Sequence, residues 1–293
     1  MPTAIEVFLH SALDYAGTFP PARLNLADAV STYARAQTGA HAWLLGRFVL
    51  PASHLQEFEQ LAPTILRDLG QPPWPLSLIM TGNSLEQVER FNTEWRGRAS
   101  IAALEFGSLD AVEIDRVAPR VPDTVDAFFE VPLLDVDLDG RIAAIARHGA
   151  SAKIRTGGIV AGAFPTETEV IRFMTACAAA RVAFKATAGL HHALRGRYPL
   201  TYEPDSPQAC MHGFVNVSVA AALVHMGASS AAVLEVLRES SAEGFAFCPS
   251  GVTWRDRNIA TADLADTRRH FFRSFGSCAF EQPVEELERL RLA

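Results

Sequence analysis

Lysine is almost absent from this chain. Only Lys153 and Lys185 are lysines among its 293 residues, and every other one of its 26 basic residues is an arginine. Arginine replaces lysine wherever only positive charge is needed, but a guanidinium group cannot lose its proton to become a nucleophilic amine. Both lysines lie in short apolar runs, Ser-Ala-Lys-Ile and Ala-Phe-Lys-Ala, where an unpaired ammonium group is rare. The pattern favours a chemical role for the two amines over a chance remnant of arginine bias.

Other absences narrow the class of protein. The formal net charge of −7 leaves no basic stripe for a nucleic-acid partner. No apolar stretch is long enough for a membrane span, and the first residues lack the basic segment of a signal peptide. The four cysteines are far apart and match no metal-ligand spacing. We therefore expect a cytoplasmic protein that acts on a small molecule without a cofactor or metal. The sequence is compatible with a homo-oligomer but does not decide the oligomeric state.

Short apolar runs alternate with stretches of helical period through most of the chain. The predicted strands are residues 12–16, 46–51, 76–81, 101–106, 127–131, 151–156, 183–187 and 213–217. Helical patterns lie between them at residues 24–36, 55–69, 85–95, 138–148 and 167–180, whereas the connection 109–125 is short for a full helix. Eight strands separated by helices predict an α/β fold, a (β/α)8 barrel. A doubly wound sheet is the alternative, but no glycine-rich dinucleotide fingerprint follows the first strand.

The end of the chain has a different pattern. Residues 231–238, 264–275 and 284–292 have helical character, and residues 244–255 are too apolar for a linker. We expect residues 1–227 to form the barrel domain and residues 228–293 to form a helical extension packed on it, with a short hairpin or lid.

Charged residues inside the predicted strands point to one site. Barrel strands place alternate side chains in the lumen, and charged ones are expected near the C-terminal ends, where barrel active sites lie. Burying six charges costs desolvation free energy that their ion pairs hardly recover. We therefore favour a catalytic site over a set of structural ion pairs. The predicted constellation is Asp14, Glu105, Glu130, Lys153, Arg155 and Lys185.

The spacing of the two lysines suggests Schiff-base chemistry. Lys153 and Lys185 are one βαβ unit apart, so they should lie on adjacent strands about 4.8 Å apart. Two ammonium groups at that distance repel each other, and repulsion with burial lowers the pKa of an amine from about 10.4 towards 7–8. A neutral amine can attack a carbonyl and form a Schiff base.

At these residues the chain resembles the deoxyribose-phosphate aldolase family, class I aldolases on a (β/α)8 barrel. The resemblance is strongest over residues 151–227, where Lys-Ile-Arg-Thr-Gly (153–157) and Ala-Phe-Lys-Ala-Thr-Ala-Gly (183–189) match the family's two lysine strands. The stretch from Gly213 is similar to its last strand and following helix. The resemblance implies that Lys153 forms the Schiff base, Lys185 activates it and Glu105 shuttles protons.

The family's phosphate-binding motifs are not matched. Arg155 replaces a serine, Gly189 is followed by Leu190 rather than a second glycine, and Asn216 stands in the place of a terminal Gly-Ser-Ser motif. Arginines could clamp an anion, glycine amides could bind it, and a histidine could recognise substrate or transfer a proton. At most one of two adjacent histidines on a strand should face the mouth. The expected substrate-binding residues are Arg155, His191, His192, Gly157, Gly158, Gly189, Asn216 and Arg47.

These residues predict a Schiff-base-forming lyase or aldolase, with Lys153 as nucleophile and Asp14, Glu105 and Glu130 as further catalytic groups. We expect a small anionic carbonyl substrate. One alternative is a metal-assisted lyase or isomerase with Glu105 and Glu130 as ligands, since carboxylates suit hard divalent cations. Another is a barrel that binds a metabolite without catalysis.

Overall fold

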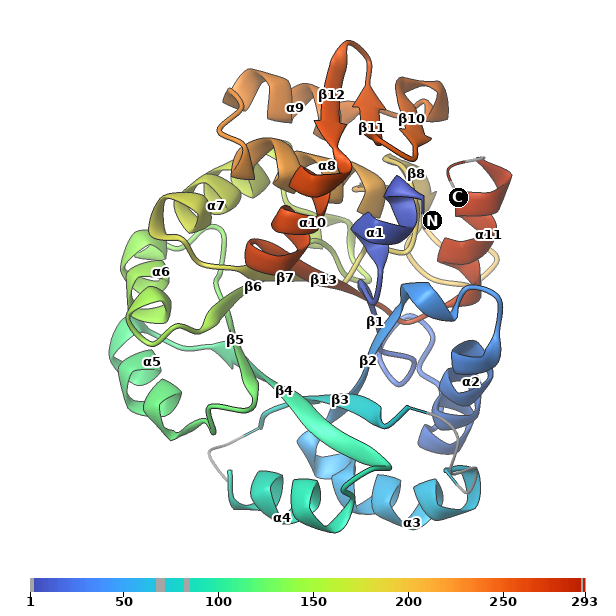
Figure 1. Ribbon diagram of the computed structural model, residues 1–293, viewed down its shortest axis with the longest axis vertical. Helices are drawn as coiled ribbons and strands as arrows, with labels where there is room; N and C mark the ends of the chain where they lie inside the picture. Colours follow the sequence, from blue (N-terminus) through green and yellow to red (C-terminus); the bar gives the residue numbers. More distant parts are fainter. Residues whose placement is uncertain (1–2, 67–71, 82–84, 291, 293) are drawn as a thin grey trace.

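Eight parallel strands close into a barrel in the computed structural model, which describes residues 3–66, 72–81, 85–290 and 292 (Figure 1). The predicted (β/α)8 fold is confirmed. Around the barrel the order is β1, β2, β3, β4, β5, β6, β7 and β13, and β13 pairs with β1 to close it. The barrel strands are β1 (Leu13–Tyr15), β2 (Leu45–Pro51), β3 (Trp74–Ile79), β4 (Ala99–Ser108), β5 (Asp126–Glu130), β6 (Ser151–Arg155), β7 (Phe184–Thr187) and β13 (Phe272–Ser277).

Helices between the strands surround the barrel (Figure 1). Several begin at side-chain caps: Asp110 caps α5 and Thr166 caps α7, each with a glutamate three residues later that completes a capping box. Residues 67–69 of the predicted helix 55–69 and residue 291 of the predicted helix 284–292 lie outside the described residues. The helices that follow barrel strands are α2 (Leu26–Thr38), α3 (Leu55–Ile65), α4 (Glu86–Glu94), α5 (Ala111–Val117), α6 (Leu138–Arg147), α7 (Glu167–Ala180), α8 (Phe214–His225) and α11 (Glu281–Arg289).

The predicted eighth strand, residues 213–217, is wrong. Gly213 caps helix α8, every residue of which from Phe214 to Val224 is buried. A helix buried all round has no polar face, so its start reads as a continuous apolar run, as a buried strand does. The true eighth strand is β13, which lies between β1 and β7.

The barrel therefore does not end at residue 227. Residues 228–293 contribute β13 and α11 to it, so the expected boundary between a barrel and an extension does not hold. The insertion between α8 and β13 consists of α9 (Ser230–Arg238), the antiparallel strands β10 (Phe245–Cys248), β11 (Gly251–Trp254) and β12 (Arg257–Ala260), and α10 (Thr261–His270). The β10–β12 sheet contacts the N-terminal helix α1 (Ala4–Leu9) and α10.

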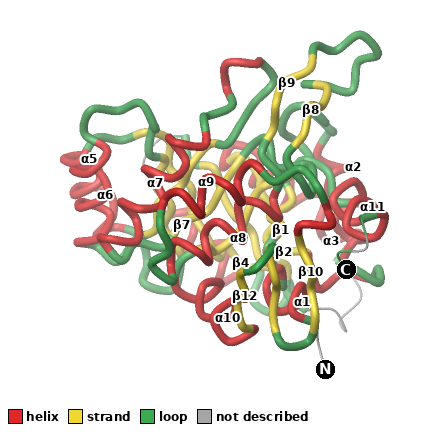
Figure 2. The backbone as a smooth tube through the Cα atoms, turned by 90° about the horizontal axis from the view of Figure 1, so that it is seen from above, coloured by secondary structure: helices red, strands yellow, loops and turns green. Residues whose placement is uncertain are grey.

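A second hairpin lies at the opposite end of the barrel (Figure 2). Strands β8 (Gly196–Pro199) and β9 (Gln208–Met211) form it within the connection from β7 to α8. It therefore lies beside the mouth, the end of the barrel where the strands finish. Of the expected hairpin or lid in the C-terminal region, the structure has the hairpin: β10 and β11 pair antiparallel within the β10–β12 sheet, away from the mouth (Figure 2).

The hydrophobic core fills the layer between strands and helices. Tyr33 of α2 packs against Phe48 of β2 and Trp74 of β3 at ring distances of 5.3 and 4.6 Å. This packing leaves the lumen of the barrel to the inward-facing side chains of the strands. Within the described residues, no helix is both long and apolar enough to span a bilayer.

Candidate active site

The two lysines lie side by side in the barrel wall. Strands β6 and β7 are parallel neighbours, and their register pairs Lys153 directly with Lys185. Only 4% of the Lys153 side chain and 1% of the Lys185 side chain are exposed. The alternation of the strands sends both side chains into the lumen, as the sequence predicted.

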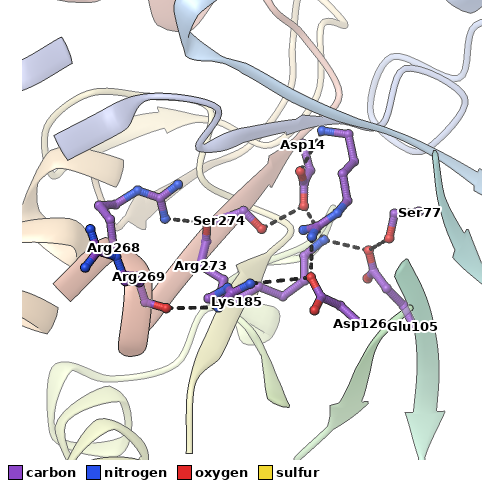
Figure 3. A network of polar contacts seen from close by, with 10 residues as sticks. Asp14, Ser77, Glu105, Asp126, Lys185, Arg268, Arg269, Arg273 and Ser274 are labelled. Atoms are coloured by element: carbon purple, nitrogen blue, oxygen red, sulfur yellow. Dashed lines mark hydrogen bonds and ion pairs between the residues drawn. The ribbon is translucent and has the colours of Figure 1, made fainter. Parts of the chain in front are cut away.

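Lys185 is held between two carboxylates from across the barrel (Figure 3). Its Nζ donates to Asp14 Oδ2 at 2.5 Å and to Glu105 Oε1 at 2.6 Å. Each carboxylate accepts a further hydroxyl hydrogen bond at 2.7 Å, from Ser274 to Asp14 and from Ser77 to Glu105. Charge-assisted hydrogen bonds of this length fix the ammonium group in one place.

The cluster shifts the pKa of each member towards its charged form. Burial alone would raise the pKa of Asp14 and of Glu105, but the Lys185 ammonium outweighs it and both pKa values lie below their ordinary range. Burial alone would lower the pKa of Lys185, but the charges of Asp14 and Glu105 outweigh it and the pKa of Lys185 is raised. Lys185 is therefore a permanent cation at neutral pH, not a free amine.

Lys153 is held less tightly. Its Nζ lies 3.6 Å from Glu105 Oε2 and 3.3 Å from Glu130 Oε2. Glu105 therefore separates the two lysines, with one oxygen facing each nitrogen. Glu130 ends β5, and its side chain is 19% exposed, so this contact lies closer to the mouth. Of the two lysines, Lys153 has the longer ion contacts and the more open partner.

Arg47 lies in a different layer of the lumen, which corrects its expected role in substrate binding. It is the third residue of β2, and its guanidinium contacts Asp126, the first residue of β5, at 2.5 Å. Arg273 reaches the same carboxylate at 3.5 Å. Phe128 stacks between layers, with its ring 5.7 Å from Arg47 Cζ and 5.4 Å from Lys185 Nζ. The sequence assigned Arg47 to substrate binding but gave no information on its depth in the barrel.

At the mouth the structure separates the two adjacent histidines. The His191 ring lies 3.1 Å from Ser277 Oγ at the end of β13, and burial lowers the pKa of His191 to about 4. His192 turns away, stacks on Tyr198 and pairs with Glu286 of α11 at 2.7 Å. Both rings border the same hollow at the mouth, but the His192 ring already has Tyr198 and Glu286 as partners, so His191 is the stronger candidate for substrate contact.

Some of the other expected binding residues lie at the mouth, and others have a role in packing. Arg155 ends β6, is 57% exposed and lies 4.0 Å from Glu130. Gly157 and Gly189 meet each other and the Phe164 ring so closely that neither has room for a Cβ atom. A packing role explains both glycines. Gly158 and Gly189 also border a hollow at the mouth.

Asn216 is outside the site, which corrects its prediction as a substrate-binding residue. It lies in α8, where its side chain donates to the carbonyl oxygens of Val236 and Glu239 and accepts from the Arg195 amide. These three hydrogen bonds join α8 to its neighbours and use the whole amide group.

Two hollows open at the mouth and share Phe164. The hairpin hollow, about 230 Å³, lies beside β8–β9 and is bordered by His191, Leu200, Tyr202 and Met211 among others. The loop hollow, about 310 Å³, lies between the loops after β5 and β6 and is bordered by Glu130, Val131, Leu133, Arg155, Phe164 and Glu169 among others. The loop hollow reaches Lys153 through Glu130.

The carboxylates do not form a metal site with the neighbours that they have. Within the described ranges, no group of three or more His, Cys, Asp or Glu side chains could hold a metal ion. Glu105, one of the two expected ligands, has one oxygen on Lys185 and Ser77 and the other towards Lys153.

Several residues of this region were missed in the sequence. Ser77 and Ser274 are single hydroxyls in apolar strands, a weak signal without the barrel register, and Ser274 falls in a stretch with helical character. Phe164 follows β6 in a loop with no motif. Tyr202 reaches Cys278 across the mouth at 3.8 Å, a contact between residues far apart in sequence.

Comparison of this chain with protein-family models and with curated proteins finds no match.

Proposed function

We propose that this protein is a Schiff-base-forming lyase of the class I aldolase type, with Lys153 as the nucleophile. The observation that carries the proposal is the pair of buried lysines on neighbouring strands that share Glu105. An ion pair of purely structural purpose would be served by arginine, which this chain uses everywhere else. A buried amine beside a second cation is an arrangement used for covalent catalysis.

The two lysines have different parts in the proposed reaction. Lys185 stays protonated, because Asp14 and Glu105 hold its charge. It supplies a fixed positive charge beside the reacting nitrogen. Lys153, with contacts of 3.3 and 3.6 Å, gives its proton to Glu130 or Glu105 and attacks the carbonyl carbon.

Proton transfers accompany each covalent step. As the new nitrogen–carbon bond forms, the carbonyl oxygen takes a proton from a carboxyl group and becomes a hydroxyl. The nitrogen then loses a second proton, which a carboxylate passes to this hydroxyl, so that water leaves and the iminium ion forms. The electron pair of the bond between the two carbons next to the iminium carbon moves towards the iminium and gives an enamine. A carboxylate takes the proton of the hydroxyl group on the departing carbon, which leaves as a second carbonyl compound. Protonation of the enamine and hydrolysis by water restore Lys153. Glu105 and Glu130 are the carboxyl groups within reach of its nitrogen.

Reductive trapping tests the proposal. The protein is incubated with simple aldehydes and ketones and then with borohydride, which reduces a Schiff base to a stable secondary amine. We expect one adduct, which peptide mass mapping locates at Lys153. The matched control is Lys153→Arg, which keeps the positive charge beside Glu105 and Glu130 but has no nucleophilic amine.

The same experiment separates the alternatives. Turnover that EDTA abolishes, with no adduct, would favour a metal-assisted lyase. Saturable binding of a carbonyl compound with neither adduct nor turnover would favour a metabolite-binding barrel. Either result contradicts the proposed Schiff base.

A further inference from the structure

Four exposed apolar side chains lie in the two loops that follow β5 and β6. They are Leu134 and Val136 in the loop after β5, and Ile159 and Val160 in the loop after β6, with exposed fractions from 39% to 100%. Across the described ranges, seven large apolar side chains are exposed, and more than half of them lie in these two loops. Single exposed apolar residues need no explanation, but a group beside a pocket indicates a binding surface.

The loop hollow between these loops is also mainly apolar. Val131, Leu133 and Phe164 border it, and Leu133 and Phe164 are only partly buried. Its volume of about 310 Å³ is at the lower end of the range for ligand pockets, about 300–1,000 Å³. The hollow is joined to the reacting amine, because Glu130 borders it and lies 3.3 Å from Lys153 Nζ.

The charges in the loop hollow disfavour an anion. Arg155 is its one basic residue, and it shares the hollow with Glu130 and Glu169. The Arg155 guanidinium is 57% exposed and lies 4.0 Å from Glu130, so its charge is screened by water and offset by a carboxylate. Among the residues that the structure describes, no arginine or lysine borders the hairpin hollow. A phosphate or carboxylate group on the substrate would thus meet more negative than positive charge.

We infer that the substrate is an apolar carbonyl compound, whose aliphatic or aromatic group lies in the loop hollow while its carbonyl carbon reaches Lys153. This inference rests on the proposed Schiff-base function and replaces the expected anionic substrate. The occupant is the substrate itself, because the hollow is bordered by Glu130, the carboxylate that lies 3.3 Å from Lys153 Nζ. The loop hollow and the exposed apolar side chains of the two loops together shield the apolar chain of the substrate from water while its carbonyl group enters the barrel.

The chain has a built-in standard for testing this. Its amines are Lys153, Lys185 and the α-amino group, so peptide mapping assigns every reduced adduct. The ratio of adduct at Lys153 to adduct at the α-amino group cancels the intrinsic reactivity of each aldehyde. The probes are propanal, butanal, pentanal and hexanal, with succinic semialdehyde as the anionic member of similar length.

We expect the ratio to rise about two- to fourfold per added methylene. Moving one methylene from water into a pocket stabilises the bound state by about fourfold when it is fully buried and by about twofold when it is partly buried. Succinic semialdehyde should give a ratio at least tenfold below that of pentanal. Leu133→Asn should lower the pentanal ratio about three- to tenfold and the propanal ratio by a smaller factor, because propanal has fewer methylenes to bury. Leu109→Asn is the matched control, since Leu109 is a half-buried loop leucine that borders neither hollow.

A ratio that stays flat along the series, or one that is highest for succinic semialdehyde, would overturn the inference while leaving the Schiff base in place. An equal effect of Leu133→Asn and Leu109→Asn would also overturn it. Absence of adduct at Lys153 with every probe would instead contradict the proposed function.

Discussion

Lys185 and Lys153 differ in how their charges are balanced. Lys185 is enclosed by Asp14 and Glu105 with hydrogen bonds of 2.5 and 2.6 Å, whereas the nearest carboxylate oxygen to Lys153 Nζ is 3.3 Å away. Removing one partner from a buried ion pair leaves the other charge without solvation. The two lysines should therefore affect stability differently.

We expect Lys185→Met to lower the free energy of unfolding by about 3–5 kcal/mol, because Asp14 and Glu105 are left buried without their cation. Lys153→Met should cost less, since Glu130 is partly exposed and Glu105 keeps Lys185. Urea unfolding at neutral pH measures both. Equal losses for the two variants would show that Lys185 is not the anchored cation.

His191 gives a prediction for acid stability. Burial lowers the pKa of His191 to about 4, while an unfolded histidine titrates near 6.5. The unfolded chain then binds the extra proton between these values, so stability falls as the pH drops from about 6.5 to 4. The loss at pH 4 should be roughly 1–3 kcal/mol.

His191→Gln should remove this dependence. Unfolding free energies of both proteins at pH 7, 5.5 and 4.5 provide the measurement. If the difference between the two proteins did not change with pH, the ring would not be held neutral by burial. The carboxylates of the lysine cluster affect stability at a lower pH. Their pKa values in the folded protein lie below those of unfolded carboxyl groups, near 4, so their contribution to stability is lost only below about pH 4.

Strand alternation predicted which side chains enter the lumen. The predicted constellation was Asp14, Glu105, Glu130, Lys153, Arg155 and Lys185. The structure brings five of these side chains together, whereas Arg155 is 57% exposed and only its edge contact of 4.0 Å with Glu130 joins it to the others. Strand alternation could not give depth, because a period of two assigns only a face. Arg47 faces inward too, yet pairs with Asp126 in a lower layer.

At the scale of elements, helix α8 shows where pattern reading fails. Its buried residues from Phe214 to Val224 carry no polar face, so neither helix nor strand periodicity is visible. Strand β13 was hidden for the converse reason, since its residues continue a stretch with helical character. Asn216, assigned to substrate binding by the strand reading, instead joins α8 to the end of α9.

We expect Asn216→Ala to lower the free energy of unfolding by about 2–4 kcal/mol, because buried carbonyl and amide groups lose their partners. The matched control is Ser218→Ala in the same helix, where one hydrogen bond to Phe214 is lost and about 1 kcal/mol or less is expected. Neither variant should change adduct formation at Lys153 while folded. A loss of adduct in folded Asn216→Ala would restore a role in substrate binding.

At the scale of the whole molecule, the barrel depends on its last strand. Strand β13 lies between β1 and β7, and supplies Ser274 to the lysine cluster and Ser277 to His191. The number of strands and the parallel order followed from the alternation of strands and helices. Closure by residues 272–277 did not, because pairing between the two ends of a chain leaves no local pattern.

A fragment of residues 1–227 should therefore fail to fold. Without β13 the edges of β1 and β7 are unpaired and Phe184 loses its contacts with Phe271 and Phe272. Circular dichroism with urea unfolding provides the measurement, with the full chain as control. A cooperative transition in the fragment would show that the barrel is complete without its last strand.

If Lys153 is the nucleophile, its amine must be available for reaction, whereas the neighbouring Lys185 ammonium group is held by its two carboxylates. Competitive labelling by a small acylating reagent measures this directly, because it compares Lys153, Lys185 and the α-amino group in one folded sample. We predict that Lys153 is acylated at neutral pH while Lys185 stays unlabelled until the protein unfolds. Faster labelling of Lys185, or labelling of Lys153 only after unfolding, would contradict the central claim.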